Sequence, residues 1–402
     1  MAQVFLFLFP FSYIFSFLGV APLGTIDLWC IVFGAFFLFC QRAVKYDKSS
    51  VIDNRLIILY FLYCISAILS LWNNPNCELS SIYHAFTIIA KVGISVFVYY
   101  AITSVKDLRL CILSLILFNI GIILCVIFLA YSHNSFFFLR EDSLIRDDIF
   151  QYAIISKPNV LNRAVLLTVS IIYVYSFFLK DRIAILGIRF ISISCLLLPI
   201  MGISRMAMAS MMLMMIVIFW KMRRKFMILT LLIIAIIGFT LPNVQNRFEE
   251  VVQRGYSLGH REETAEVSLR NIKQNPLLGL GKRSSIGILE RSSAPVTGKD
   301  RRIIFEHNMV LAMLLEDGII GLTIFLSLLF VYIKFLLDSM RKMKNPMFKY
   351  LIFACLMGFI GFMLTTLTGG TINENILWYQ VGLSLAIIKL DRKEQGYNSS
   401  YN

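Results

Sequence analysis

Runs of about twenty apolar residues recur along most of the chain, and this pattern limits what the chain can fold into. A helix needs roughly 20 consecutive apolar residues to cross the hydrocarbon core of a bilayer. Hydrophobic residues make up 58% of the 402 residues and charged residues 15%. Soluble domains have about 45–50% and about 25%. We therefore predict an all-α polytopic membrane protein, and the composition excludes soluble, disordered, collagen-like and disulfide-scaffold classes.

Twelve segments are candidate transmembrane helices. They are residues 4–22, 24–40, 55–72, 82–103, 108–131, 160–179, 186–203, 206–220, 226–242, 318–337, 350–368 and 375–390. The predicted organisation is nine helices within 1–242, a large outer loop at 243–317, three helices within 318–390 and a disordered polar tail at 391–402. The stretch 186–220 reads as a hairpin, with Gly202, Ser204 and Arg205 at its bend.

The distribution of basic residues predicts how these helices are oriented. Cytoplasmic connections of membrane proteins carry an excess of lysine and arginine. If the N-terminus is cytoplasmic, every inner connection has at least two such residues, whereas the outer connections 22–27, 73–81 and 369–375 have none. We therefore predict that both termini are cytoplasmic and that 132–159 and 243–317 lie outside. The basic residues that orient the helices among the membrane lipids account for much of the net charge of +14, so no nucleic-acid partner is expected.

Two basic residues stand out against this background. Lys91 lies nine residues inside its predicted helix, which is roughly 13 Å deep. A charge at that depth either serves function or pairs with a polar neighbour for packing only. Arg205, at the outer bend, is either an anion clamp or an interfacial arginine whose side chain reaches toward water. No phosphate-binding loop, HExxH motif or zinc-spaced Cys/His cluster is present, so neither a metal nor a cofactor is expected.

The outer loop holds two informative stretches, NIKQNPLLGLG at 271–281 and EHNMVLAMLLEDGIIGL at 306–322. His307 opens an apolar, helix-like stretch, Asn308 can cap that helix or form another hydrogen bond, and Gly318 can end it. All four histidines of the chain fall on or near the predicted outer side. An imidazole titrates near neutral pH, so this placement suits proton transfer outside the membrane.

Together these residues resemble the signature of the O-antigen ligase/polymerase superfamily. The matching positions are Ser204 and Arg205; Arg261, Asn275, Pro276, Gly279 and Gly281; and His307, Asn308, Glu316, Gly318, Ile319, Gly321 and Leu322. Their order, spacing and predicted side of the membrane agree with the family over residues 202–322.

The resemblance implies a lipid-donor glycosyltransferase fold of the GT-C-like type. Family members take a glycan from undecaprenyl pyrophosphate on the outer face of the bacterial inner membrane. Ligases pass it to lipid A–core oligosaccharide, and polymerases pass it to another repeat unit. If the matching positions have the same roles as in the family, His307 is the general base, and Arg205 and Arg261 bind the pyrophosphate without a metal. We add Asn308 and Lys91 as candidate substrate-binding residues.

The leading interpretation is therefore an O-antigen ligase acting on undecaprenyl-pyrophosphate-linked O-antigen and lipid A–core. An O-antigen or capsule polymerase with the same donor is the alternative. A polysaccharide-lipid flippase or other transporter is a hypothesis of a different class. It predicts ionisable residues distributed along an inner cavity, whereas those of this chain concentrate at the predicted outer face.

Overall fold

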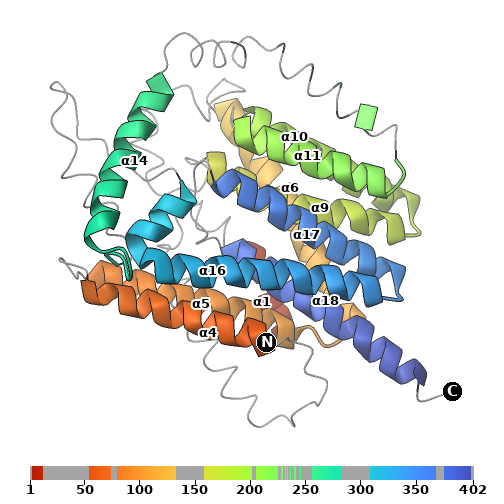
Figure 1. Cartoon of the computed structure of the whole chain (residues 1–402). Coiled ribbons are helices and arrows are strands. Elements are labelled where there is room, and N and C mark those ends of the chain that lie inside the picture. The colour runs from red at the N-terminus through yellow and green to blue at the C-terminus, as the bar shows by residue number, and fades with distance from the viewer. Residues whose placement is uncertain are drawn as a thin grey trace.

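The computed structural model describes residues 2–11, 54–73, 79–132, 158–201, 205–224, 256–281, 308–367 and 375–399, with isolated positions between 228 and 245. All regular elements in these ranges are helices, with no strand among them (Figure 1). The predicted all-α class is confirmed for this part of the chain. The predicted span 24–40 and most of 226–242 lie outside the described residues. So do residues 133–157 of the predicted outer segment 132–159.

The described elements follow the predicted spans closely. They are α1 (Ala2–Leu8), η1 (Phe9–Phe11), α4 (Asn54–Leu69), η2 (Ser70–Asn73), α5 (Leu79–Ala101), α6 (Val105–Ser132), α9 (Pro158–Tyr175), η4 (Ser176–Phe178), α10 (Arg182–Met201), α11 (Arg205–Lys221), α14 (Tyr256–Gln274), α16 (Met309–Lys342), α17 (Pro346–Thr366) and α18 (Asn375–Ser399). Among them, α4 with η2, α6, α10, α16 and α17 include stretches long and apolar enough to cross a membrane. The total of twelve stays a prediction.

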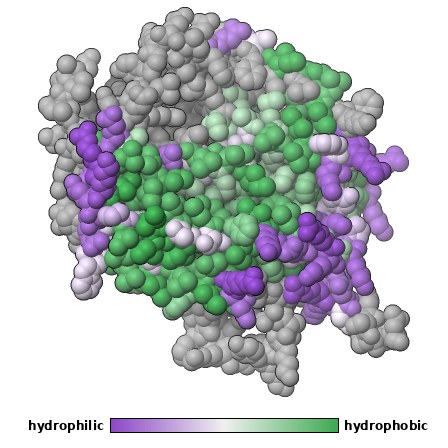
Figure 2. Space-filling view, in the orientation of Figure 1, coloured by the Kyte–Doolittle hydropathy of each residue, from purple (hydrophilic) through white to green (hydrophobic). Residues whose placement is uncertain are grey.

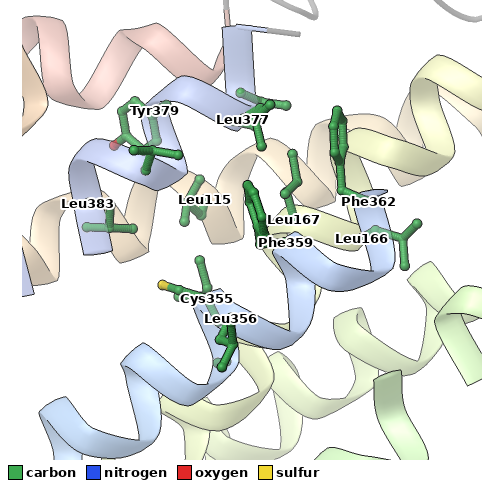
Figure 3. Packing of buried hydrophobic residues seen from close by; sticks show 14 of the residues in the cluster. Leu115, Leu166, Leu167, Cys355, Leu356, Phe359, Phe362, Leu377, Tyr379 and Leu383 are labelled. Atoms are coloured by element: carbon green, nitrogen blue, oxygen red, sulfur yellow. The ribbon is translucent and has the colours of Figure 1, made fainter. Parts of the chain in front are cut away.

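Helix α9 is at the centre of the bundle. Every residue from 162 to 174 is buried, so this helix has no lipid-facing or water-facing side along that stretch. It lies very close to α17, because a Cβ added at Gly358 would be 2.8 Å from the hydroxyl of Ser170. Figure 3 shows the layer of large apolar side chains that α6, α9, α17 and α18 build around this contact.

One end of the bundle collects the N-terminal helix, the connections 102–104, 179–181, 222–224 and 343–345, and the last turns of α18. The joining contacts are Gln3 with Asp107, Lys389 with the carbonyl of Tyr99, Asn345 with Asp391 and Glu394, Phe178 with Tyr350, and Arg224 with Phe177. The charge pattern predicts the cytoplasmic side for each of these segments. Figure 2 shows an apolar belt across the middle of the visible face, with hydrophilic residues toward both ends of the bundle.

The expectation of a disordered tail is wrong for residues 391–399, which continue α18. The reason is a set of polar contacts with the α16–α17 connection. The side-chain amide of Asn345 donates to Glu394 at 3.0 Å, and its backbone N–H donates to Asp391 at 3.3 Å. Burial raises the pKa of the Asp391 carboxyl, although the hydrogen bonds from Asn345 and Gln395 act in the opposite direction.

Helix α16 begins at Met309, so the predicted boundary between loop and membrane helix at 317/318 falls inside a helical element. That boundary is nevertheless physically marked. Gly318 has φ 66° and ψ −171°, which interrupts the helix and separates a short first part, 309–317, from the long membrane helix. In Figure 1 the first part of α16 turns away from the long part, towards α14.

Candidate functional site

The turn that follows α14, residues 275–281, docks onto the break in α16 at Gly318. This contact joins the two sequence motifs. An uninterrupted helix would bond the N–H groups of Ile319 and Ile320 to the carbonyls four residues earlier. The break leaves these two N–H groups and the carbonyls of Leu315 and Glu316 without their helical partners. Each of the four groups forms a hydrogen bond with the turn instead. The bonds are Leu280 N–H to Leu315 O at 2.8 Å, Gly281 N–H to Glu316 O at 2.9 Å, Ile319 N–H to Pro276 O at 2.8 Å and Ile320 N–H to Leu277 O at 3.2 Å.

The glycines of both motifs are required by this docking. Gly279 has φ 68°, Gly281 φ 87° and Gly318 φ 66°, all in the left-handed region that L-residues with a side chain rarely adopt. A Cβ at Gly279 would be 2.6 Å from the carbonyl carbon and oxygen of Glu316. A Cβ at Gly318 would be 2.2 Å from the carbonyl oxygen of Leu277. The two backbones can therefore approach only because neither position has a side chain.

Asn308 fixes the start of the short helix 309–317. Its side-chain oxygen accepts hydrogen bonds from the N–H of Val310 at 2.9 Å and of Leu311 at 3.4 Å. This is the N-cap geometry that the sequence allowed for. The half-buried side chain thus has a structural role, while its candidate role in substrate binding stays a prediction. His307 directly precedes the cap but is itself outside the described residues.

Residues 190–326 match the family model for O-antigen ligase. We therefore place this part of the chain in the O-antigen ligase superfamily. The matched range runs from α10 through α11 and α14 into α16, so it includes the docked turn and the break at Gly318. The resemblance inferred from the motifs is confirmed. No curated protein matches the chain.

Two arginines of the O-antigen ligase region are placed by their backbones. Arg205 is the first residue of α11, and Arg261 lies in the second turn of α14. The side chains of both are outside the described part of the structure. The structure thus places α14, which contains Arg261, against α16, whose N-cap is Asn308. The meeting of both guanidinium groups with His307 stays a prediction.

Lys91 lies outside the matched O-antigen ligase range, on α5. It is only 6% exposed, as expected for a residue in the middle of a membrane helix. Ser95, four residues further on, lies on the same helix face. That face is close to α18, because a Cβ added at Gly382 would be 2.4 Å from the backbone of Ser95. Helix α5 packs mainly against α4 and α18, so Lys91 belongs to that part of the bundle.

Sequence reasoning passed over two polar residues at the start of α9. Asn162 and Arg163 are 1% and 3% exposed, and both precede the matched O-antigen ligase range. The available signal was an arginine three residues inside the predicted span 160–179, which resembles the ordinary charged edge of a membrane helix. Only the packing shows that this end of α9 is enclosed. Among the described residues, no group of three or more His, Cys, Asp or Glu side chains could hold a metal ion.

Proposed function

We propose that the chain is an O-antigen ligase that transfers O-antigen polysaccharide from undecaprenyl pyrophosphate to lipid A–core oligosaccharide. The observation that carries this proposal is the docking of the 275–281 turn onto the break in α16, within the region that matches the family. We further propose a lipid-donor, GT-C-like fold with about twelve transmembrane helices in the bacterial inner membrane, with 243–317 as its large outer loop.

The length of α16 supports a site on the periplasmic face. Lys342 follows Gly318 by 24 residues, which is about 36 Å of helix at roughly 1.5 Å per residue. The hydrocarbon core of a bilayer is about 30 Å thick. Because α16 ends among the basic connections, the docked turn lies at the opposite membrane face. A donor whose lipid stays in the bilayer could present its sugar there.

The proposed reaction is a single displacement. His307 takes the proton of the acceptor hydroxyl as that oxygen attacks the anomeric carbon. The bond from that carbon to the pyrophosphate oxygen breaks, and Arg205 and Arg261 stabilise the charge on the departing group. Guanidinium groups suit this task because they bind phosphate oxygens bidentately. One displacement inverts the anomeric configuration, and no nucleotide or metal is required because the sugar–phosphate bond is already activated.

The test uses purified protein in lipid discs with undecaprenyl-pyrophosphate-linked O-antigen. His307→Ala should lower the transfer rate roughly 10²–10⁴-fold while donor binding and protein abundance stay unchanged. His307→Gln should be equally inactive, since an amide cannot take the proton. His84→Ala, on α5, serves as the matched control. Retention of the anomeric configuration, or a His307→Ala rate within a few-fold of wild type, would contradict the mechanism.

The acceptor decides between the ligase and the alternative polymerase, which share donor and chemistry. Supplying lipid A–core and a second lipid-linked repeat unit in separate reactions distinguishes them. Product on lipid A–core alone supports the ligase, and chain extension alone supports the polymerase. Movement of the intact donor across a sealed vesicle without any glycosidic transfer would instead support a flippase.

A further inference from the structure

The outer end of α9 contains buried polar side chains that the proposed mechanism does not use. The other end of this helix lies among the basic connections, where Phe177 contacts Arg189 and Arg224. Asn162 and Arg163 are therefore near the same membrane face as the docked turn. Both are almost completely buried, at 1% and 3% exposure.

Several polar atoms in this region have no hydrogen-bond partner. Both the amide oxygen and the amide nitrogen of Asn162 lack one, as does the hydroxyl of Ser210 on α11. Buried polar groups in folded proteins are nearly always paired, so each unpaired group calls for an explanation. Two helices contributing such groups at one end of the bundle point to a ligand with several hydrogen-bonding atoms.

The packing one turn deeper brings together the two helix faces that carry Asn162 and Ser210. A Cβ at Gly361 of α17 would be 3.3 Å from Leu166 and 3.7 Å from Met214, so these two side chains meet at one point. Asn162 and Ser210 each lie four residues earlier on α9 and α11, which is one turn outward on the same helix faces. The two helices run in the same direction, with the rings of Tyr173 and Phe219 5.1 Å apart.

An apolar layer lies directly beneath this polar region. Figure 3 shows Leu166 and Leu167 of α9 on either side of Phe362 of α17. Leu166 is one turn deeper than Asn162. Polar atoms above an apolar floor suit a ligand whose charged group must stay at the membrane face.

Electrostatics specify the charge of that ligand. A helix N-terminus carries a partial positive charge, which disfavours a nearby cation and favours an anion. Helix α9 has Arg163 in its second turn, α11 begins with Arg205, and neither has an acidic residue in its first turn. Two arginines beside two parallel helix N-termini are stabilised when an anion binds between them.

We infer that Arg163 and Asn162 bind phosphate oxygens of the lipid pyrophosphate donor at the outer ends of α9 and α11. Arg163 supplies a guanidinium to the pyrophosphate, and the amide of Asn162 donates a further hydrogen bond. Arg205, the first residue of the neighbouring helix α11, is the ligand already proposed for the same group. This inference rests on the proposed function, because the ligand is the donor of that reaction.

The experiment measures binding of farnesyl diphosphate to the purified full chain in lipid discs. Arg163→Gln should weaken binding roughly 10- to 100-fold, since a charge-assisted, bidentate contact is lost. Arg163→Lys should recover only part of this loss because lysine lacks the planar fork. Asn162→Ala should have a smaller effect in the same direction. Arg189→Gln, which changes an arginine at the opposite end of the bundle, should bind as wild type does.

Two further probes define what is recognised. Inorganic pyrophosphate should compete with farnesyl diphosphate in the wild type and lose this ability in Arg163→Gln. Farnesol, which has the chain but no phosphate, should bind equally weakly to both proteins. An equal loss of farnesol binding in the variants would show a packing role only and overturn the inference.

The failure of the inference is distinct from that of the proposed function. If wild type binds neither farnesyl diphosphate nor the undecaprenyl donor, the proposed function fails. If wild type binds while Arg163→Gln and Asn162→Ala bind equally tightly, the inference alone fails. Should Arg163→Gln not fold, as judged by its melting temperature and abundance, Asn162→Ala decides the question.

Discussion

The docking of the 275–281 turn predicts a large effect for a very small change, Gly279→Ala. An L-residue with a side chain at φ 68° costs about 1–2 kcal/mol in backbone strain. The added methyl would also be 2.6 Å from three backbone atoms of Glu316 and Gly318, so strain cannot be relieved by a rotamer change. Undocking the turn instead loses four backbone hydrogen bonds, each worth about 0.5–1.5 kcal/mol net. We therefore expect a cost of about 2–6 kcal/mol for the docked arrangement.

Hydrogen exchange followed by mass spectrometry measures this directly. The amides of Leu280, Gly281, Ile319 and Ile320 should exchange roughly 30-fold or more faster in Gly279→Ala, while amides of α17 should be unchanged. Transfer activity should fall with the loss of protection, because the docked turn holds the short helix that follows His307.

Gly187→Ala is the matched control. It introduces the same methyl group within α10, where nothing lies within 4 Å of the added Cβ. It should leave exchange and activity unchanged and stabilise the helix by up to about 1 kcal/mol. Unaltered exchange at the four docking amides of Gly279→Ala, with wild-type activity, would refute the argument that the glycine permits this contact.

Three other predictions concern single features. Asn308→Ala should lower stability by about 1 kcal/mol through loss of the cap, whereas Asn308→Asp should retain the cap; activity lost in both would support substrate contact through the amide nitrogen. In intact spheroplasts, an impermeant maleimide should label Glu266→Cys on α14 and not Lys344→Cys, and the reverse pattern would exclude the proposed orientation. Both positions are exposed. Transfer should persist in excess chelator, and its loss with recovery on adding magnesium would require a metal site outside the described residues.

The membrane helices could be predicted because apolar runs of fixed length leave few alternatives. The capping of the 309–317 helix by Asn308 and its interruption at Gly318 also followed from local residue chemistry. The start of α16 at Met309 did not follow from hydropathy, since the helix begins beyond the span that the bilayer requires. The helical tail was missed because its order comes from contacts between Asn345 and α18, which are distant in sequence.

The functional residues show a similar division. The two motifs were recognised separately, but their spacing does not reveal that the 275–281 turn supplies the bonding partners lost at Gly318. This replacement of hydrogen-bond partners depends on left-handed φ angles at Gly279, Gly281 and Gly318 and on the close approach of two backbones. Asn162 and Arg163 were missed for the opposite reason. Their residue types are visible in the sequence, but an arginine near a helix end is common, and only burial separates it from a solvated one.

The docking also explains the composition of the family motifs in this chain. Pro276, Gly279, Gly281 and Gly318 contribute backbone groups and left-handed conformations, so the contact requires no side-chain chemistry at these positions. Variants at these positions should therefore lose hydrogen-exchange protection and activity together. Variants of His307, by contrast, should lose activity with protection intact. A protein that lost both properties in His307→Ala would show that this histidine maintains the docked structure instead of acting on the substrate.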